Sequence, residues 1–185
     1  LTSVTTADGS ITVDAGGTMS ATVVTAGGGD ADDDVSLSTS AGDIAASAIT
    51  ATGNDVTLNA AGSVTDGNAG ATNITAANLD ATAATGIDLD TDADSITAAV
   101  SGTGVVDIDE SDAVTLTSVT TADGSITVDA GGTMSATVVT AGGGDADDDV
   151  SLSTSAGDIA ASAITAAGND VTLNAAGSVT DGNAA

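Results

Sequence analysis

The chain contains a long internal repeat, and this repeat limits its possible folds more than any other feature. The sequence that starts at Leu1 starts again at Leu116, an offset of 115 residues, and only two of the 70 overlapping pairs differ, at positions 52/167 and 70/185. Near-identity over this length indicates a tandem array of one structural unit. We expect residues 1–185 to form a single continuous domain made of residues 1–115 and a truncated second copy, residues 116–185. Because the chain begins with Leu1, we also expect a mature product or an excerpt of a longer protein.

A shorter rhythm runs inside the long repeat. Triplets of the form apolar–polar–apolar recur as ITV at 11, VSL at 35, VTL at 56, IDL at 87, VDI at 106 and ITV at 126. Alternation with period two is typical of a strand with one buried face. The spacings are 24, 21, 31, 19 and 20 residues, which predicts five coils of about 23 residues in each long repeat.

Segments rich in Gly, Asn and Asp separate the triplets, and these residues permit tight corners. The pattern predicts an all-β fold, a right-handed parallel β-solenoid (β-helix) with about 20–23 residues per coil and roughly eight coils. The chain has no Phe, Tyr or Trp, so we expect a slim interior of stacked small aliphatic side chains. Each coil would need a neighbour on both sides to bury its apolar face.

Two other conformations compete with this prediction. Alanine is abundant and favours helix, but it is interleaved with Thr, Val, Ser and Gly, which favour strands and turns. Low complexity and high net charge are typical of disorder. The regular β-branched triplets favour the solenoid over both.

The charge balance restricts the partners of the chain. It carries 27 acidic residues and no Lys, Arg or His, for a formal charge of −27. Proteins that bind nucleic acid neutralise phosphates with Lys and Arg, so we expect no nucleic-acid partner. An anionic membrane surface would repel the chain, and we expect no membrane insertion because no apolar run approaches the ~20 residues that span a bilayer.

The side chains also argue against catalysis. Without His, Cys, Lys, Arg or Tyr, only carboxylates and hydroxyls remain as catalytic groups, and nothing in the pattern indicates a pocket that would tune them. We therefore expect a protein that is not an enzyme. Ice binding through a flat threonine array is a further alternative, which the mixture of Ser, Asp and Thr at the outward triplet positions disfavours.

The outward positions of the aligned triplets predict ladders of carboxylates. Stacking of the coils would place Asp90, Asp109 and Asp129 in one ladder and Asp88 and Asp107 in another. Like charges at strand spacing destabilise a sheet, and the chain offers no side-chain cation to offset them. Divalent cations are the matching partner, Ca²⁺ above all, because it takes about six to eight oxygen ligands in flexible geometry.

The segments GGGDADDD, DLDTDAD and DIDESD carry the clustered oxygens. The candidate metal ligands are Asp30, Asp32, Asp33, Asp34, Asp88, Asp90, Asp92, Asp94, Asp107, Asp109, Glu110, Asp112, Asp145, Asp147, Asp148 and Asp149. The alternative is that these residues form a solvated acidic face that keeps a secreted fibre soluble.

Stretches such as AGDIAASAITATGNDVTLNAAGSVTD and GSITVDAGGT resemble the repeat regions of giant bacterial surface proteins, the filamentous-haemagglutinin-like and β-strand-repeat adhesins. The resemblance implies a right-handed β-helix on the bacterial cell surface, serving as the stalk or fibre of an adhesin. Two alternatives remain open. One is a self-assembling extracellular filament or sheath, in which copies associate end to end or laterally. The other is a module whose folding outside the cell is triggered by calcium.

Overall fold

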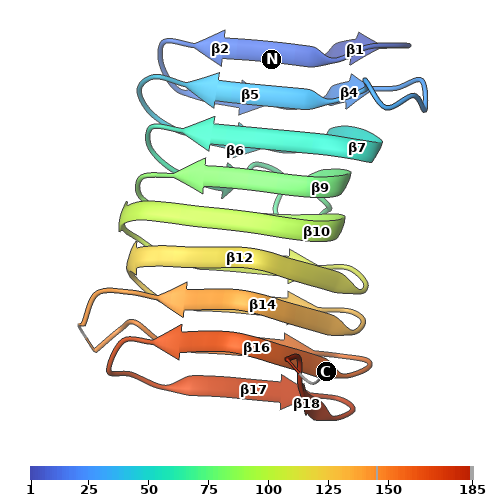
Figure 1. The fold of residues 1–185 in the computed structure, drawn as a ribbon. Helices are drawn as coiled ribbons and strands as arrows, with labels where there is room; N and C mark the ends of the chain where they lie inside the picture. Colours follow the sequence, from blue (N-terminus) through green and yellow to red (C-terminus); the bar gives the residue numbers. More distant parts are fainter. Residues whose placement is uncertain (145, 184–185) are drawn as a thin grey trace.

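The computed structural model describes residues 1–144 and 146–183, and within these residues it contains strands and no helix (Figure 1). The strands are β1 Val4–Thr6, β2 Ile11–Ala15, β3 Met19–Ala21, β4 Val24–Ala26, β5 Val35–Thr39, β6 Ile44–Ala46, β7 Ile49–Ala60, β8 Val64–Asp66, β9 Ile74–Ala83, β10 Ile87–Thr103, β11 Val106–Glu110, β12 Val114–Asp123, β13 Ile126–Ala130, β14 Met134–Ala141, β15 Val150–Thr154, β16 Ile159–Ala166, β17 Val171–Ala175 and β18 Val179–Asp181.

The strands pair in parallel and stack into three columns. Column A contains β2, β5, the C-terminal parts of β7, β9 and β10, and then β12, β14, β16 and β18. Column B contains β3, β6, β8, the first part of β10, and then β11, β13, β15 and β17. Column C contains β1, β4, the N-terminal parts of β7 and β9, and the middle of β10.

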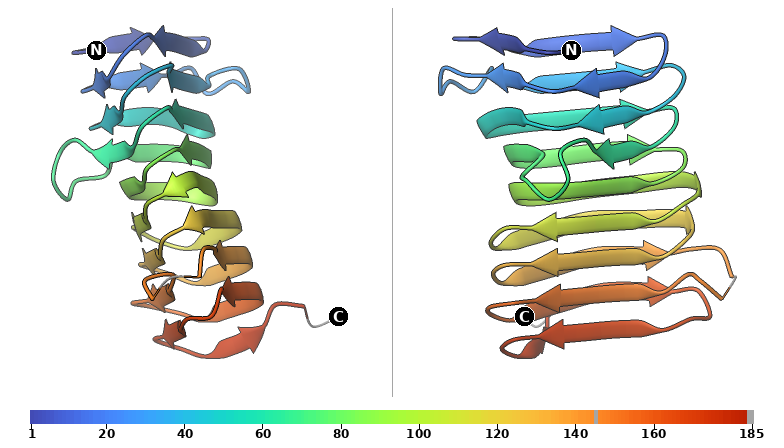
Figure 2. Two further views of the ribbon diagram at one scale, coloured as in Figure 1. Left: turned by 90° about the vertical axis from the view of Figure 1, so that its left-hand side faces the viewer. Right: turned by 180° about the vertical axis from the view of Figure 1, so that it is seen from behind.

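The chain winds as a right-handed β-solenoid of about eight coils, as the sequence predicted. In Figure 1 column A faces the viewer and runs leftward; the chain then passes behind, returns in column B and descends one level with each coil. Figure 2 shows the same stack from the side and from behind. Coil length ranges from 17 residues, between Leu79 and Ile96 in column A, to 25 residues, between Met19 and Ile44 in column B.

The interior is filled by small aliphatic side chains. Leu37, Leu58, Ile108 and Leu116 have no exposed surface, and the alternating burial of each strand places one side chain in two toward the interior. Strands with alternating apolar residues form here because each buried row packs on the rows of the coils above and below. The slim aliphatic core predicted from the sequence is confirmed.

The alignment of all six triplets in one stack, on which the predicted carboxylate ladders were based, is wrong. The triplets at 11, 35 and 56 stack in column A, and those at 87, 106 and 126 stack in column B, so the six do not form a single file. In column A, Val56 is followed by Leu79. Residues 79–81 read Leu-Asp-Ala, a triplet whose second apolar residue is alanine, and alanine gives only a weak strand signal.

Candidate metal centre

Column B carries two ladders of carboxylates on its outer surface. Asp88 pairs with Asp107 in register, and Asp90 pairs with Asp109, which pairs with Asp129. Both ladders predicted from the sequence are therefore confirmed. Their formation follows from the strand alternation, which points Ile87, Leu89 and their equivalents inward and the aspartates outward.

The proximity of these carboxylates changes their acidity. Burial raises the pKa of Asp88, Asp90 and Asp107 above its ordinary value of 3.8, and the negative charges of neighbouring carboxylates raise it further. For Asp88 and Asp90 the strongest of these neighbours is Asp66, the last residue of β8. The folded chain thus holds protons on this surface more tightly than the same residues would in an open chain.

Three carboxylates lie close enough to share one ion. Oxygens of Asp92, Glu110 and Asp112 all lie within 4.8 Å of one another, and this triad could hold a metal ion. Asp92 lies in β10, Glu110 ends β11, and Asp112 lies in the turn before β12. Asp92 and Asp112 are exposed, whereas Glu110 is 4% exposed. All three donors are hard oxygens, which suit Ca²⁺ or Mg²⁺.

Glu110 is held in place by hydrogen bonds from two coils. Its Oε2 accepts from Thr91 Oγ1 at 2.7 Å and from the Ala93 N–H at 3.0 Å, and its Oε1 accepts from the Asp112 N–H at 3.2 Å. Glu110 pairs with Thr91 and Ala130 at a corner of the coil where the side chain points inward. Burial raises the pKa of Glu110 above its ordinary value of 4.5, although these hydrogen bonds favour the carboxylate.

In the acidic loop of residues 27–34, one buried carboxylate stabilises the loop by accepting backbone hydrogen bonds. Asp33 is buried, and it accepts hydrogen bonds from the Gly9 N–H at 2.7 Å and from the Asp30 N–H at 3.0 Å. Asp34 accepts from the Asp55 N–H at 3.1 Å. Asp30 and Asp32 are exposed, and among the described residues no three carboxylates of this loop lie close enough together to share one metal ion.

The corresponding loop of residues 142–149 repeats this arrangement. Asp148 accepts from the Gly124 N–H at 2.7 Å and from the Gly144 N–H at 2.5 Å, and Asp149 accepts from the Asp170 N–H at 3.0 Å. Asp147 is exposed, as is Asp94 in β10. Asp145 lies outside the described residues.

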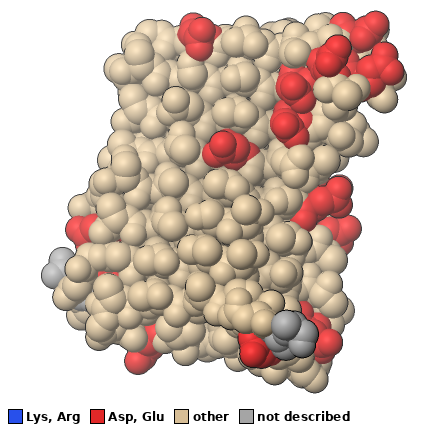
Figure 3. Space-filling model, viewed as in Figure 1, with Lys and Arg blue, Asp and Glu red and all other residues tan. Residues whose placement is uncertain are grey.

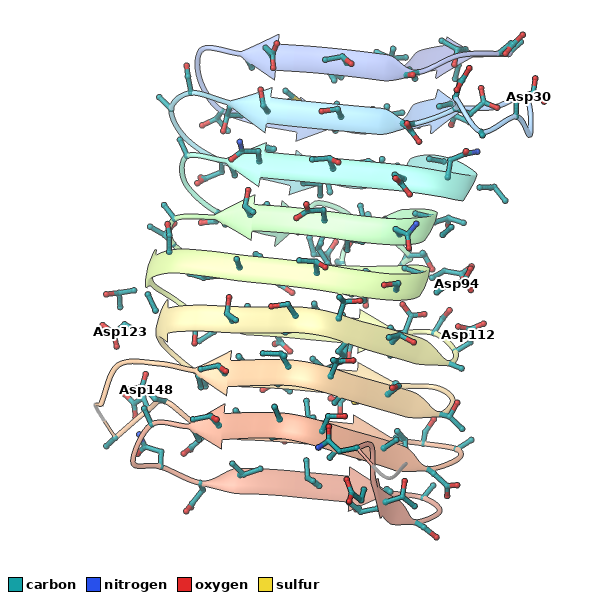
Figure 4. The ribbon with its side chains drawn as sticks, in the orientation of Figure 1. Asp30, Asp94, Asp112, Asp123 and Asp148 are labelled. Atoms are coloured by element: carbon teal, nitrogen blue, oxygen red, sulfur yellow. The ribbon has the colours of Figure 1, made fainter. Side chains whose placement is uncertain are left out.

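The acidic side chains leave much of one face uncharged. In the view of Figure 3, the red carboxylates gather along the right-hand edge and at the corners, and most of the broad surface over column A is tan. Figure 4 places Asp94 and Asp112 at that same right-hand edge. The triad is therefore a feature of an edge, where the chain turns into column A.

Sequence reasoning missed the structure of the loop between β8 and β9. Asp66 accepts hydrogen bonds from the backbone N–H groups of Asn68, Ala69 and Gly70 and from Asn73 Nδ2. Asn73 is buried and also donates to the Ala46 carbonyl at 3.1 Å. The Asp-Gly-Asn segment at 66–68 was the available signal, because such residues favour turns closed by their own side chains.

Comparison of the chain with protein-family models, with curated proteins and with solved structures gave no match. Among the described residues, no helix has the length and hydropathy to cross a bilayer.

Proposed function

We propose that this chain is a rod-forming spacer segment of an extracellular fibre, and that it gives reach and stiffness without catalysis. One observation carries the proposal: column A continues through nine strands, from β2 in the first copy of the repeat to β18 in the second. Each coil packs on its neighbours through the same small aliphatic residues. Additional coils therefore lengthen the rod and require no new kind of core.

The placement on a bacterial cell surface, in the stalk of an adhesin, is supported by the resemblance of the repeat segments to the repeat regions of such adhesins. It is also supported by the charge. A chain with 27 acidic residues and no basic ones repels other copies and stays hydrated, which suits a long protein in solution outside the cell.

Electron microscopy of the purified chain tests the rod. Eight coils spaced about 4.8 Å apart give a stack on the order of 38 Å long. A chain with two copies of residues 1–115 should be longer by the rise of the added coils and no wider. A particle that grows in width would contradict the proposal. Long filaments from the 185-residue chain would instead favour the self-assembling filament.

A second candidate function is stiffening of the rod, or its folding outside the cell, by calcium, and the triad of Asp92, Glu110 and Asp112 favours it. Three carboxylates within 4.8 Å repel one another, and a divalent cation between them would remove the repulsion. The ion would link β10 to the end of β11 and to the residues that follow it, and it would stabilise the folded state through binding. At a hundredfold excess over its Kd, this stabilisation is about 2.7 kcal/mol.

Titration with Ca²⁺ at fixed ionic strength, followed by far-UV circular dichroism and thermal melting, tests this function. Mg²⁺ serves as the control ion. We expect Ca²⁺ to raise Tm in the natural chain and in D32N, whose exposed side chain lies outside the triad. The rise should be much smaller in D112N. An equal rise in Tm in D32N and D112N would show that the triad does not bind the ion. An unchanged Tm in the natural chain would show that the chain binds no calcium specifically.

A further inference from the structure

The two copies of the repeat place the same sequence on different sides of the solenoid. Ile11 begins a strand of column A and pairs with Val35. Its counterpart Ile126 begins a strand of column B, where it pairs with Val106 and Val150. Column A advances five coils from Ile11 to Leu116 through the successive pairings. Ile126 lies on the return strand of the next coil, so one repeat corresponds to about five and a half coils.

The residues that follow this strand move in the opposite direction, from columns B and C in the first copy to column A in the second. Residues 19–26, of sequence MSATVVTA, form β3 in column B and β4 in column C, with a bend between them. The same eight residues at 134–141 form the single strand β14 in column A. Both sides of the coil have therefore changed places, which is the result expected for a half-turn about the solenoid axis.

The acidic loops follow this exchange. The loop of residues 27–34 leaves the right-hand edge of the solenoid, between β4 and β5, and the loop between β14 and β15 leaves the left-hand edge (Figure 1). Figure 4 shows Asp30 and Asp148 at these opposite edges. Because Asp33 and Asp148 accept the same 2.7 Å hydrogen bond from equivalent glycines, the local structure of the loop is kept and only its side of the rod changes.

The residues between the two copies produce the half-turn. After β8 in column B, the chain enters β9, which spans columns C and A, and then the 17-residue strand β10, which spans columns B, C and A. β11 then starts the run of five-residue strands in column B, whereas β2 and β5 are the five-residue strands of column A. The segment of residues 71–115 thus adds a whole number of coils plus one half, so the second copy starts on the opposite side of the solenoid.

We propose that successive 115-residue units of this rod are rotated by half a turn. The acidic loop then projects alternately from two opposite edges, and the surface repeats only after two units. This inference rests on the proposed function as a rod of continuing units.

Distances between spin labels test the rotation in the 185-residue chain, which has no native cysteine. One sample carries D32C and D147C, equivalent exposed positions in the two loops. A second sample carries D32C and A156C. Residue 156 is also exposed and lies in the turn between β15 and β16, on the same edge as residue 32.

The half-turn predicts that the distance between the first pair of labels is longer than the distance between the second pair. About five and a half coils separate the first pair along the axis, or roughly 26 Å, and about six coils separate the second pair, or roughly 29 Å. Because the first pair also spans the width of a strand such as β14, its distance should be roughly 37 Å or more. If the units were in phase, the first pair would give the shorter distance, and the proposal would be overturned.

A third pair guards against local perturbation of the loops. T18C and T133C replace equivalent exposed threonines that lie beside β3 and β14, and they should again give a distance longer than their axial separation of about 26 Å. Circular dichroism confirms that each variant keeps its strands. If electron microscopy shows rods but the label distances fit units in phase, the half-turn is wrong and the proposed function is unaffected. If the particles are not rods, the proposed function itself is wrong.

Discussion

Gly131 lies directly against Ser111 of the preceding coil. A Cβ atom added to Gly131 would fall 2.0 Å from the Ser111 carbonyl oxygen, although the Gly131 backbone itself is one that other residues can adopt. Its counterpart in the first copy, Gly16, has no heavy atom within 4 Å of the same position. The two glycines have the same sequence neighbours and differ in the coil that lies beside them.

We therefore predict that G131A destabilises the chain and that G16A does not. The added methyl group at 131 must push apart two hydrogen-bonded coils, and overpacking of this kind costs about 1–3 kcal/mol. Urea unfolding followed by circular dichroism gives both values. Equal effects of the two substitutions would show that the stacking of Gly131 on Ser111 is wrong.

The acidic ladders predict an unusual dependence of stability on pH. The folded pKa values of Asp88, Asp90, Asp107 and Glu110 are raised, so the folded chain binds protons more tightly than the unfolded chain does. These groups add stability as the pH falls from 7 toward about 4. The pKa of Asp66 is lowered from 3.8 by its hydrogen bonds, so its contribution is lost on further acidification.

Thermal melts at low salt and low protein concentration, from pH 7 to 4.5, measure this effect, and Tm should rise over that range. The double variant D88N/D107N provides the control and should show a smaller rise. Added salt should also reduce the rise, because screening weakens the repulsion that the protons relieve. A Tm that falls steadily from pH 7 would contradict the raised pKa values.

The acidic loop predicts different roles for two adjacent aspartates. Asp33 is 1% exposed and accepts backbone hydrogen bonds, whereas Asp32 is exposed. D33A leaves the N–H groups of Gly9 and Asp30 without their acceptor, which costs about 1–3 kcal/mol. D32A should change the free energy of unfolding by less than about 0.5 kcal/mol. If D32A proved the more damaging, Asp33 would not be the structural residue of the loop.

The slim core predicts equal sensitivity on the two sides of the rod. Leu37 in column A and its counterpart Leu152 in column B are both fully buried. L37A and L152A should each cost about 2–5 kcal/mol, because the rigid stack cannot close around the cavity. V105A, at a side chain that is 49% exposed, is the control and should be nearly neutral. A neutral L152A would place this residue outside the core.

The sequence predicted the fold because the coil is a local pattern. Each buried row depends on alternation within a few residues, and this alternation is plain at Ile11, Val35 and Val106. The column to which a strand belongs could not be predicted, because all columns use the same apolar–polar–apolar alternation. At Leu79 the pattern is weakened by Ala81, so the half-turn between the copies was not visible.

The candidate site was predicted in composition but not in geometry. Asp92 belongs to the acidic segment DLDTDAD, and Glu110 and Asp112 belong to DIDESD. Nothing in their spacing distinguishes these three residues from the other candidate metal ligands. What brings them together is the register of β10 on β11, which places Thr91 against Glu110. Asp33 and Asp148 were expected as metal ligands, but their oxygens accept backbone hydrogen bonds, a role that becomes visible only when the loop conformation is known.

The hydrogen bonds that join one coil to the next run along the solenoid axis, and this direction determines how the molecule responds to tension. A pull on the two ends loads the coil interfaces in series, so the outermost coil detaches first while the remainder stays intact. A coil of about 21 residues that rises ~4.8 Å when folded extends to about 70 Å when stretched. We therefore expect a tether that absorbs a mechanical shock by releasing coils one at a time and recovers its length when the load is removed.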